Sequence, residues 1–434
     1  MRILFVHQNF PGQYRHILKH FAADSDNEIV FLAQNAHAEF PGIRKLVYQI
    51  RREPGRGTHH YLRPLERAVL HGQEVARAAL ALKEQGFVPD IMIGHNAWGE
   101  TLYLKDAFPD APLLSYFEFF YSEHGLDVDF DPEFPPSIDT RMRVQTLNAI
   151  NLLGLQTADR GQTATEWQRG TYPSCYHDMI SVAHEGIDTD LVKPDPEATL
   201  RLDGGLSLSR RNEVVTYVSR QLEPYRGFHV FMRALPEILR RRPKAHAVIV
   251  GGDEKGYGAA HPEGKTWRQA MLDELGGKLD ASRVHFLGQV PYETYLKVLQ
   301  ISSAHVYLTY PFVLSWSMLE AMAAGCLVIG STTPPVEAVI EDGDNGLLVE
   351  FFNIKGLVET VEAVLGDRTH SGNVGMRGRQ IIRERYDLGS VCLPMQIALV
   401  DSVLRGMGDD VTSQDNGRDQ ANKGLSLVKK SAAI

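Results

Sequence analysis

The chain has 434 residues, which exceeds the length at which a single hydrophobic core stops growing, so we expect two domains or three. Hydrophobic residues make up 43% and charged residues 23%, as in ordinary globular proteins. The net charge of −9 argues against a dedicated nucleic-acid-binding protein. The three cysteines are far apart, in no metal or redox spacing, which favours a reducing cytoplasm.

Residues 1–6 form an apolar stretch that is too short for the core of a signal peptide. No apolar run approaches the ~18 residues that a membrane-spanning helix needs. We therefore expect a cytoplasmic protein, with at most a peripheral contact at the inner face of the cell membrane.

Apolar strands alternate with amphipathic helices along the chain, which is typical of a parallel sheet covered on both faces. The first half predicts helices over 64–85 and 139–153, and strands near 3–6, 28–33, 90–94, 113–117 and 179–183. The second half predicts a linker over 188–211, and strands near 213–219, 246–250, 284–287, 305–309 and 327–329.

These elements predict an α/β protein with two Rossmann-like, doubly wound domains that face each other across a cleft. The first domain would span 1–188 and the second 189–384, with helices at about 385–405 as candidates to pack back on the first. Residues 408–434 have little to bury and are expected to form a disordered tail. Ligands of such sheets bind outside the carboxyl ends of the strands.

Glycine and arginine residues follow several of these strand ends. Gly12 lies in the first strand–helix turn, where a glycine allows close approach of the backbone to a ligand. Arg220 and Arg226 lie on one loop after the strand at 213–219, and two guanidinium groups there suit a diphosphate. Gly252 follows the next strand and leaves room for a base or ribose. A plain turn at Gly12 and a solvated charged loop around the arginines stay open as alternatives.

His95 and Glu118 also follow predicted strand ends and would face the cleft. Structural roles remain the alternative for both, because a lone histidine is more often structural and aromatic neighbours of Glu118 more often pack than bind.

The stretch from 310 to 330 predicts a strand end, a turn, a short helix and another buried strand. Ser317 and Glu320 have the spacing of a capping box, which predicts a helix start near Ser317. A helix that opens just after a strand is an anion site. Glu320 would reach a polar ligand there, or it would only cap its own helix.

Two charged segments have no assigned partner. The acidic loop 126–136 would shape the site of a second substrate or remain a solvated surface loop. It contains Asp127 and Asp129, which have an Asp-x-Asp spacing but lie in this long loop and not at an obvious metal site of the cleft. The region 44–67 carries seven Arg or Lys against two Glu, and is a candidate contact for anionic lipid or a phosphorylated acceptor, or an ordinary basic surface.

Several motifs resemble those of the retaining glycosyltransferases of family 4, which have the GT-B fold, and the likeness extends to about residue 405. Residues 219–227 are similar to the family's donor-phosphate loop, with Arg226 in the place of a lysine. Residues 286–290 resemble the segment whose backbone reads the base, ending at Val290. Residues 317–325 resemble the helix that places a glutamate, here Glu320, on the ribose. Residues 184–188, 334–337 and 342–349 also match the family pattern.

The sequence departs from that family at two positions. A glutamate that contacts the donor sugar usually lies eight residues before the helix glutamate, and Phe312 stands there. The resemblance then implies that backbone N–H groups take over as sugar and phosphate contacts; these belong to Phe312, Val313, Leu314 and Ser315. A histidine of the first domain is replaced by Glu118, with His95 as a candidate substitute. A bacterial branch of the family shares Pro-Phe-Val-Leu-Ser-Trp-Ser.

The resemblance implies a metal-independent hexosyltransferase of bacterial polysaccharide or glycoconjugate synthesis, without a cofactor. It would move a hexose from a nucleoside diphosphate sugar to a saccharide, lipid-linked or other hydroxyl acceptor, with retained configuration. Arg220, Arg226, the helix start at Ser317 and the Gly12 loop would stabilise the departing diphosphate. The alternatives are a nucleotide-sugar epimerase on the same fold and a non-catalytic sugar-nucleotide-binding protein.

Overall fold

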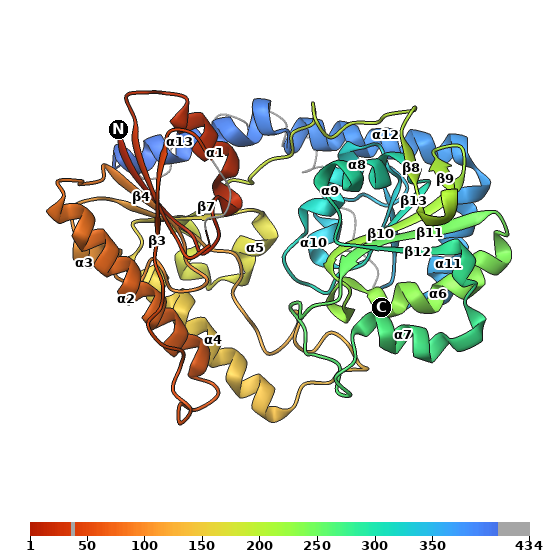
Figure 1. The fold of residues 1–434 in the computed structure, drawn as a ribbon, viewed down its shortest axis with the longest axis horizontal. Coiled ribbons are helices and arrows are strands. Elements are labelled where there is room, and N and C mark those ends of the chain that lie inside the picture. Colours follow the sequence, from red (N-terminus) through yellow and green to blue (C-terminus); the bar gives the residue numbers. More distant parts are fainter. Residues whose placement is uncertain (36–39, 407–434) are drawn as a thin grey trace, which may run out of the picture.

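The protein consists of two parallel α/β sheets, each with helices on both faces (Figure 1). The structure, a computed structural model, describes residues 1–35 and 40–406. The expected tail at 408–434 lies outside this part. No helix of the described chain is both long and apolar enough to cross a bilayer.

The first sheet has seven parallel strands in the order β3-β2-β1-β4-β5-β6-β7. Its strands are β1 (Arg2–Val6), β2 (Glu28–Ala33), β3 (Ile43–Val47), β4 (Ile91–His95), β5 (Leu113–Tyr116), β6 (Arg160–Thr163) and β7 (Ile180–Val182). Its helices are α1 (Arg15–Ala22), α2 (Arg63–Glu84), α3 (Leu104–Ala107), α4 (Ile138–Thr157) and α5 (Glu166–Thr171).

The second sheet has six parallel strands in the order β12-β11-β10-β13-β14-β15. These are β10 (Glu213–Gln221), β11 (Ala245–Gly252), β12 (Val284–Gly288), β13 (Ala304–Tyr307), β14 (Val328–Ser331) and β15 (Leu347–Val349). The helices around it are α6 (Phe228–Arg241), α7 (Trp267–Leu275), α8 (Tyr292–Ile301), α9 (Trp316–Ala323), α10 (Pro334–Glu337), α11 (Ile354–Gly366) and α12 (Arg368–Arg385).

Continuous apolar runs produce this architecture because alternate residues of one strand bury in cores on opposite faces. In β1, Ile3 and Phe5 belong to one core, whereas Leu4 and Val6 belong to the other. Such strands stay buried only when helices cover both faces of the sheet. Two parallel sheets of this kind confirm the predicted α/β class with two doubly wound domains.

The last helix, α13 (Leu393–Leu404), crosses back to the first sheet and lies beside α1 (Figure 1). Its residues Leu399, Val400 and Val403 join the same core as Ile3 and Phe5. The outgoing chain meets the returning chain at Ile187, whose N–H donates to the carbonyl of Tyr386 (2.8 Å). The two sheets are therefore connected twice at one place.

The segment 188–211 is not the open linker that its turn residues and charges indicated. It contains an antiparallel hairpin of β8 (Thr199–Arg201) and β9 (Ser207–Ser209). Val192, Leu200 and Leu208 are buried in the core of the second sheet. The prediction was wrong because few apolar residues, spaced among charges, suffice to anchor a short hairpin.

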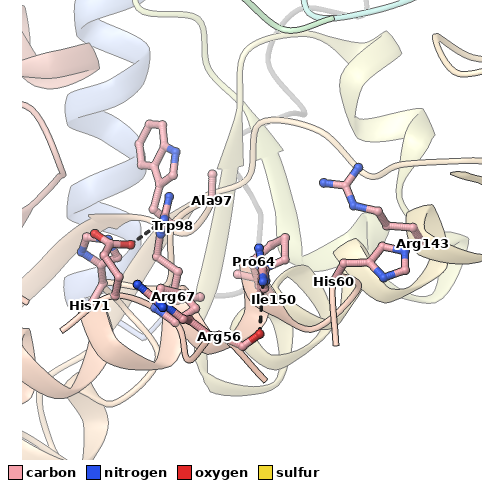
Figure 2. Close-up of a pocket in the computed structure, with 13 residues that line it drawn as sticks. Arg56, His60, Pro64, Arg67, His71, Ala97, Trp98, Arg143 and Ile150 are labelled. Atoms are coloured by element: carbon pink, nitrogen blue, oxygen red, sulfur yellow. Dashed lines mark hydrogen bonds and ion pairs between the residues drawn. The ribbon is translucent and has the colours of Figure 1, made fainter. Parts of the chain in front are cut away.

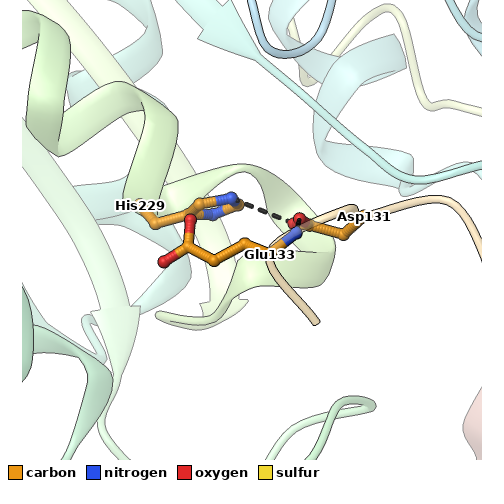
Figure 3. Close-up of side chains that lie close together, drawn as sticks. All are labelled: Asp131, Glu133 and His229. Atoms are coloured by element: carbon orange, nitrogen blue, oxygen red, sulfur yellow. Dashed lines mark hydrogen bonds and ion pairs between the residues drawn. The ribbon is translucent and has the colours of Figure 1, made fainter. Parts of the chain in front are cut away.

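The loop 126–136 is not a solvated surface loop, because it docks on the second sheet's domain. Asp131 is 3% exposed, and it lies 3.1 Å from Nε2 of His229 (Figure 3). It also accepts a hydrogen bond from the hydroxyl of Tyr310 (2.5 Å). Glu133 pairs with Arg233 at 2.7 and 2.9 Å. Because both oxygens of Glu133 already pair with an arginine, the Asp131–Glu133–His229 group is an interdomain contact and a poor cation ligand set.

Removing the buried carboxylate should release this loop. We expect Asp131→Ala to speed limited proteolysis within 126–136 about tenfold or more, because it leaves the hydroxyl of Tyr310 and the ring of His229 buried without a partner. Asp129→Ala is the matched control, since Asp129 bonds only to His124 and Gly125 of its own turn. Equal cleavage rates in the two variants would contradict the docking role of Asp131.

Candidate functional site

Arg220, near the end of strand β10, and Arg226, in the short 3-10 turn after it, line one small cavity at the carboxyl end of the second sheet. The strand extends to Gln221, so Arg220 is not on the loop where the sequence predicted it. Ser315 and Ser317, from the start of α9, line the same cavity of about 40 Å³. This is the convergence that the strand-end positions predicted. The roles of these residues toward a donor stay predictions.

Arg226 is a buried cation with no carboxylate partner in the described part of the chain. It is 7% exposed, and its Nη1 donates to the hydroxyls of Tyr307 (3.1 Å) and Thr309 (2.7 Å). Its guanidinium lies 5.5 Å from the ring centre of Tyr257 and 5.9 Å from that of Phe312. The charges of Glu223 and Glu118 act on Arg226 without forming an ion pair in the described chain, so this buried guanidinium can still attract an anion.

Phe312 fills the position where the resembled family has a sugar-facing glutamate. Its ring is 6% exposed and packs on Phe119 of the first domain, with 4.9 Å between ring centres. It also meets Tyr257 at 4.9 Å. An apolar wall therefore lies beside Arg226 where the family pattern would have a second carboxylate.

The start of α9 differs from the prediction. Ser315, not Ser317, is the N-cap, and its hydroxyl accepts from the N–H of Ser317 (3.3 Å). The N–H of Ser315 donates to the hydroxyl of Tyr307 (2.9 Å), so this group is not free for a donor sugar. The S-x-x-E spacing misled because a second serine two residues earlier offers the same cap.

Glu320 does not fold back to cap its own helix. Its two carboxylate oxygens accept from the hydroxyls of Tyr292 and Tyr295 of α8, each at 2.6 Å. Burial raises the pKa of Glu320, and these two hydrogen bonds oppose the shift. Two tyrosines thus fix the orientation of the Glu320 carboxylate on α9, where it remains a candidate ribose ligand.

The remaining donor-side residues surround this centre without lining the cavity. A Cβ on Gly252 would lie 2.5 Å from Oε1 of Gln221 and 2.8 Å from Nε2 of Gln289, so a larger residue would have to displace the ends of these two side chains. Val290 packs at the edge of the core under α8 and α9, while Leu314 is buried and Val313 is half-buried.

On the first sheet, His95 and Glu118 lie near each other at the carboxyl ends of the adjacent strands β4 and β5. His95 is fully buried; its Nδ1 accepts from the N–H of Ala97 (3.2 Å), so Nε2 carries the proton. That nitrogen has no hydrogen-bond partner among the described residues and lies 3.9 Å from Oε2 of Glu118. Burial and the nearby charge of Glu185 raise the pKa of Glu118 to about 7.

The Gly12 turn lies next to this pair. Gly12 has a φ of +55°, and a Cβ there would come within 2.6 Å of the ring of His7. His7 in turn lies edge-on to His95, with 5.1 Å between ring centres. Burial lowers the pKa of both histidines, that of His7 to about 4, so both rings are neutral near pH 7.

Glu185 joins the two halves of the cleft and was missed from the sequence. Buried at 4% exposure, it accepts hydrogen bonds from Tyr116 of β5 and from the indole of Trp316 of α9 (3.1 Å). In the sequence, Glu185 was noted only as part of the segment 184–188. That segment predicted where the chain passes between the domains, but not that Glu185 bonds to both.

A second buried carboxyl lies behind the first sheet's loops. Glu100 is fully buried, and its Oε1 accepts from the hydroxyl of Tyr48 (2.8 Å), which also contacts Nδ1 of His71 (3.1 Å). Within 1–35 and 40–406, its Oε2 has no hydrogen-bond partner. Burial raises the pKa of Glu100 to about 7.

Neutralising Glu100 should therefore stabilise the protein in alkaline solution. Because the folded-state pKa is raised, the native state binds the proton more tightly, and stability is lost as pH rises from about 4.3 to 7. Glu100→Gln should recover up to about 3 kcal/mol at pH 8.5 and little at pH 4. Thermal unfolding at both pH values measures this, and an equal shift at both would contradict it.

Comparisons with known proteins identify the family of the chain. The chain matches the Glycosyl transferase family 4 group over residues 25–192 and Glycosyl transferases group 1 over residues 207–381. The phosphatidyl-myo-inositol mannosyltransferase of Mycolicibacterium smegmatis is 32% identical over 306 residues, covering 69% of this chain and 70% of that one. The D-inositol 3-phosphate glycosyltransferase of Nocardia farcinica is 29% identical over 202 residues, covering 46% of this chain and 43% of its own length.

Solved structures share the fold at low sequence identity. Sucrose-phosphate synthase from Thermosynechococcus elongatus superposes with a TM-score of 0.69 at 16% identity, over 92% of this chain and 98% of that chain. Anabaena HepE, in complex with UDP and glucose, gives 0.63 at 18% identity, over 93% and 99%. The fold and the cleft define a GT-B protein. The chain belongs to the group 1 glycosyltransferases, with a family 4 group N-terminal half.

Proposed function

We propose that the protein is a retaining, metal-independent hexosyltransferase that uses a nucleoside diphosphate sugar. The observation that carries this proposal is Arg226, a buried cation without a carboxylate partner, at a cavity that it shares with Arg220 and the start of α9. Glu118 and His95 provide the polar groups of the opposite domain. Names of relatives and neighbours, which include GDP-mannose and UDP, support a sugar-nucleotide donor and leave its base open.

In this reaction the bond between the anomeric carbon and the diphosphate oxygen breaks, and its electron pair leaves with the diphosphate. Arg220, Arg226 and the N-terminus of α9 would stabilise that charge electrostatically. The acceptor hydroxyl attacks from the same face, and its proton passes to the departing phosphate oxygen. Docking of the first domain on the second excludes water, which limits hydrolysis of the donor.

The direct test incubates the protein with UDP- and GDP-hexoses, with and without a polyol or lipid acceptor and with EDTA present. We expect release of the nucleoside diphosphate together with a glycoside of retained configuration by NMR. Isomerised donor without transfer would favour the epimerase, and binding without turnover would favour a non-catalytic protein. Loss of transfer in EDTA would contradict metal independence.

The proposed role of the enzyme is in bacterial polysaccharide or glycoconjugate synthesis. The names of the relatives concern inositol phosphates and phosphatidylinositol, which fits a role in glycoconjugate synthesis at the inner membrane face. Contact of the 44–67 region with anionic lipid, in a protein of the cytoplasm, stays a prediction that flotation with anionic vesicles would test.

A further inference from the structure

One buried carboxylate bonds to both domains. Glu185 follows shortly after β7 in the first domain and is 4% exposed. Its Oε1 accepts from the hydroxyl of Tyr116, at the end of β5, and its Oε2 accepts from the indole N–H of Trp316 (3.1 Å). Trp316 is the first residue of α9 in the second domain. Glu185 therefore joins a strand end of the first sheet to a helix start beside the second.

In the second domain, this bond acts on the residues that line the small cavity with the two arginines. Trp316 stands between Ser315 and Ser317, which both line that cavity. The side chain of Trp316 is 44% exposed, so packing fixes it less than it would a buried side chain, and the bond to Glu185 carries more of its positioning. Loss of that bond would leave the first turn of α9, whose N–H groups suit an anion, less firmly placed.

In the first domain, the same carboxylate reaches the Glu118–His95 pair. Tyr116, which donates to Glu185, stacks on the imidazole of His95, with 5.1 Å between ring centres and 22° between planes. Trp98 lines a cavity of about 800 Å³ in this domain (Figure 2). Its indole also stacks on His95, with 4.6 Å between ring centres. These two rings hold the imidazole whose Nε2 lies 3.9 Å from Glu118.

The charge of Glu185 also acts on Glu118. Burial and then Glu185 raise the pKa of Glu118 to about 7, whereas Arg226 and Arg220 of the second domain oppose the shift. Burial shifts the pKa of every other ionisable group described around the two carboxyls toward its neutral form. These groups are His16, His95, His184, Tyr14, Tyr116, Tyr121, Tyr172 and Cys392. Among the described residues, Glu185 is therefore the anion that acts on Glu118.

We propose that Glu185 is a positioning residue of the transfer reaction, which holds the start of α9 through Trp316 and the Glu118–His95 pair through Tyr116. The proposal rests on the proposed function and adds a residue that acts through other side chains and not on the reacting atoms. Because Trp316 loses its acceptor when the domains separate, the start of α9 has this support only when the two domains are docked.

The first test follows the ionisation of Glu118 without an assay of turnover. In protein isotope-labelled at the glutamate carboxyl carbons, the NMR signal of Glu118 is the one that Glu118→Gln removes, and in the wild type it should titrate near pH 7. Glu185→Gln keeps an acceptor oxygen and removes the charge, so the Glu118 midpoint should move to a pH about one unit lower. Glu100→Gln removes another buried carboxyl of the same domain and should leave the Glu118 midpoint in place.

The second test measures the support of α9. Trp316→Phe keeps an aromatic ring and removes the indole N–H that donates to Glu185. Calorimetric titration with UDP and GDP should show that this variant binds the nucleotide about tenfold more weakly than the wild type, because a charge-assisted hydrogen bond supports the binding-competent arrangement. Trp267→Phe is the matched control, since its indole donates to the carbonyl of Ala259 within its own domain (3.3 Å), and it should bind like wild type.

The two tests can each overturn the proposal. A Glu118 midpoint that Glu185→Gln leaves unchanged, or that Glu100→Gln moves equally far, contradicts it. Unchanged nucleotide affinity in Trp316→Phe, or an equal loss in Trp267→Phe, contradicts it as well. Absence of UDP and GDP binding in the wild-type protein counts against the proposed donor site, and the NMR signal of Glu118 alone then decides the role of Glu185.

Discussion

Replacing Arg226 by methionine is expected to lower turnover by about 10²- to 10³-fold, because the variant loses a preorganised cation at the departing diphosphate. The protein should nevertheless fold. Methionine fills the space between Tyr257 and Phe312 with an apolar chain, and replacing a buried charge by a packed apolar residue is often neutral or stabilising. Single-turnover kinetics and thermal unfolding, measured together, separate the two effects.

Two further variants sharpen this expectation. Arg226→Lys keeps the charge, but one ammonium group cannot replace the fork that contacts Tyr307 and Thr309 while it also binds a phosphate, so most of the loss should remain. Arg240→Met removes an exposed arginine of α6 and should leave turnover unchanged. Full activity in Arg226→Met would exclude this loop as the diphosphate site.

The continuous apolar runs of the sequence predicted the positions of the strands correctly. The strand predicted over 28–33 is β2 as found, and the strands of both sheets with continuous apolar stretches were located to within one or two residues at most ends. The edge strand β3 was missed because it is half-exposed and carries Arg44 and Lys45. The strand β6 reads Arg-Gly-Gln-Thr, which has no hydrophobic pattern, and β15 has only three residues.

The positions of candidate site residues could be predicted where a residue directly follows the end of a predicted strand. Arg220, Arg226 and Ser317 meet because their strands are parallel and adjacent in the sheet. Contacts across the cleft had no such signal. Glu185 with Trp316 depends on how two separate domains dock, and no local periodicity encodes that.

The burial of the loop 126–136 also depends on contacts between the domains and could not be predicted from the sequence. Its acidic residues resemble a solvated loop in sequence, and their burial follows from Tyr310 and Arg233, more than 90 residues further along the chain. The helix start was predicted two residues too late, at Ser317 instead of Ser315. Both serines can cap a helix, and only the backbone conformation decides between them.

Glu118→Gln is expected to lower kcat/KM by about 10²-fold and to flatten its dependence on pH around 7. With Phe312 apolar, the carboxylate 3.9 Å from His95 is that of Glu118, and its negative form would stabilise the positive charge that develops on the sugar ring. Burial and Glu185 raise its pKa to about 7, so the wild-type rate should rise from pH 6 to 8 as Glu118 ionises.

Glu100→Gln is the matched control, because burial raises the pKa of Glu100 to about 7 as well, although Glu100 contacts Tyr48 and not the cleft pair. It should keep the rise in rate between pH 6 and 8, which Glu118→Gln should lose. A rise that persists in Glu118→Gln would assign the ionisation to another group. If both variants lose the rise in rate, the rise would reflect the stability of the first domain, because Glu118 and Glu100 both belong to that domain and do not contact each other.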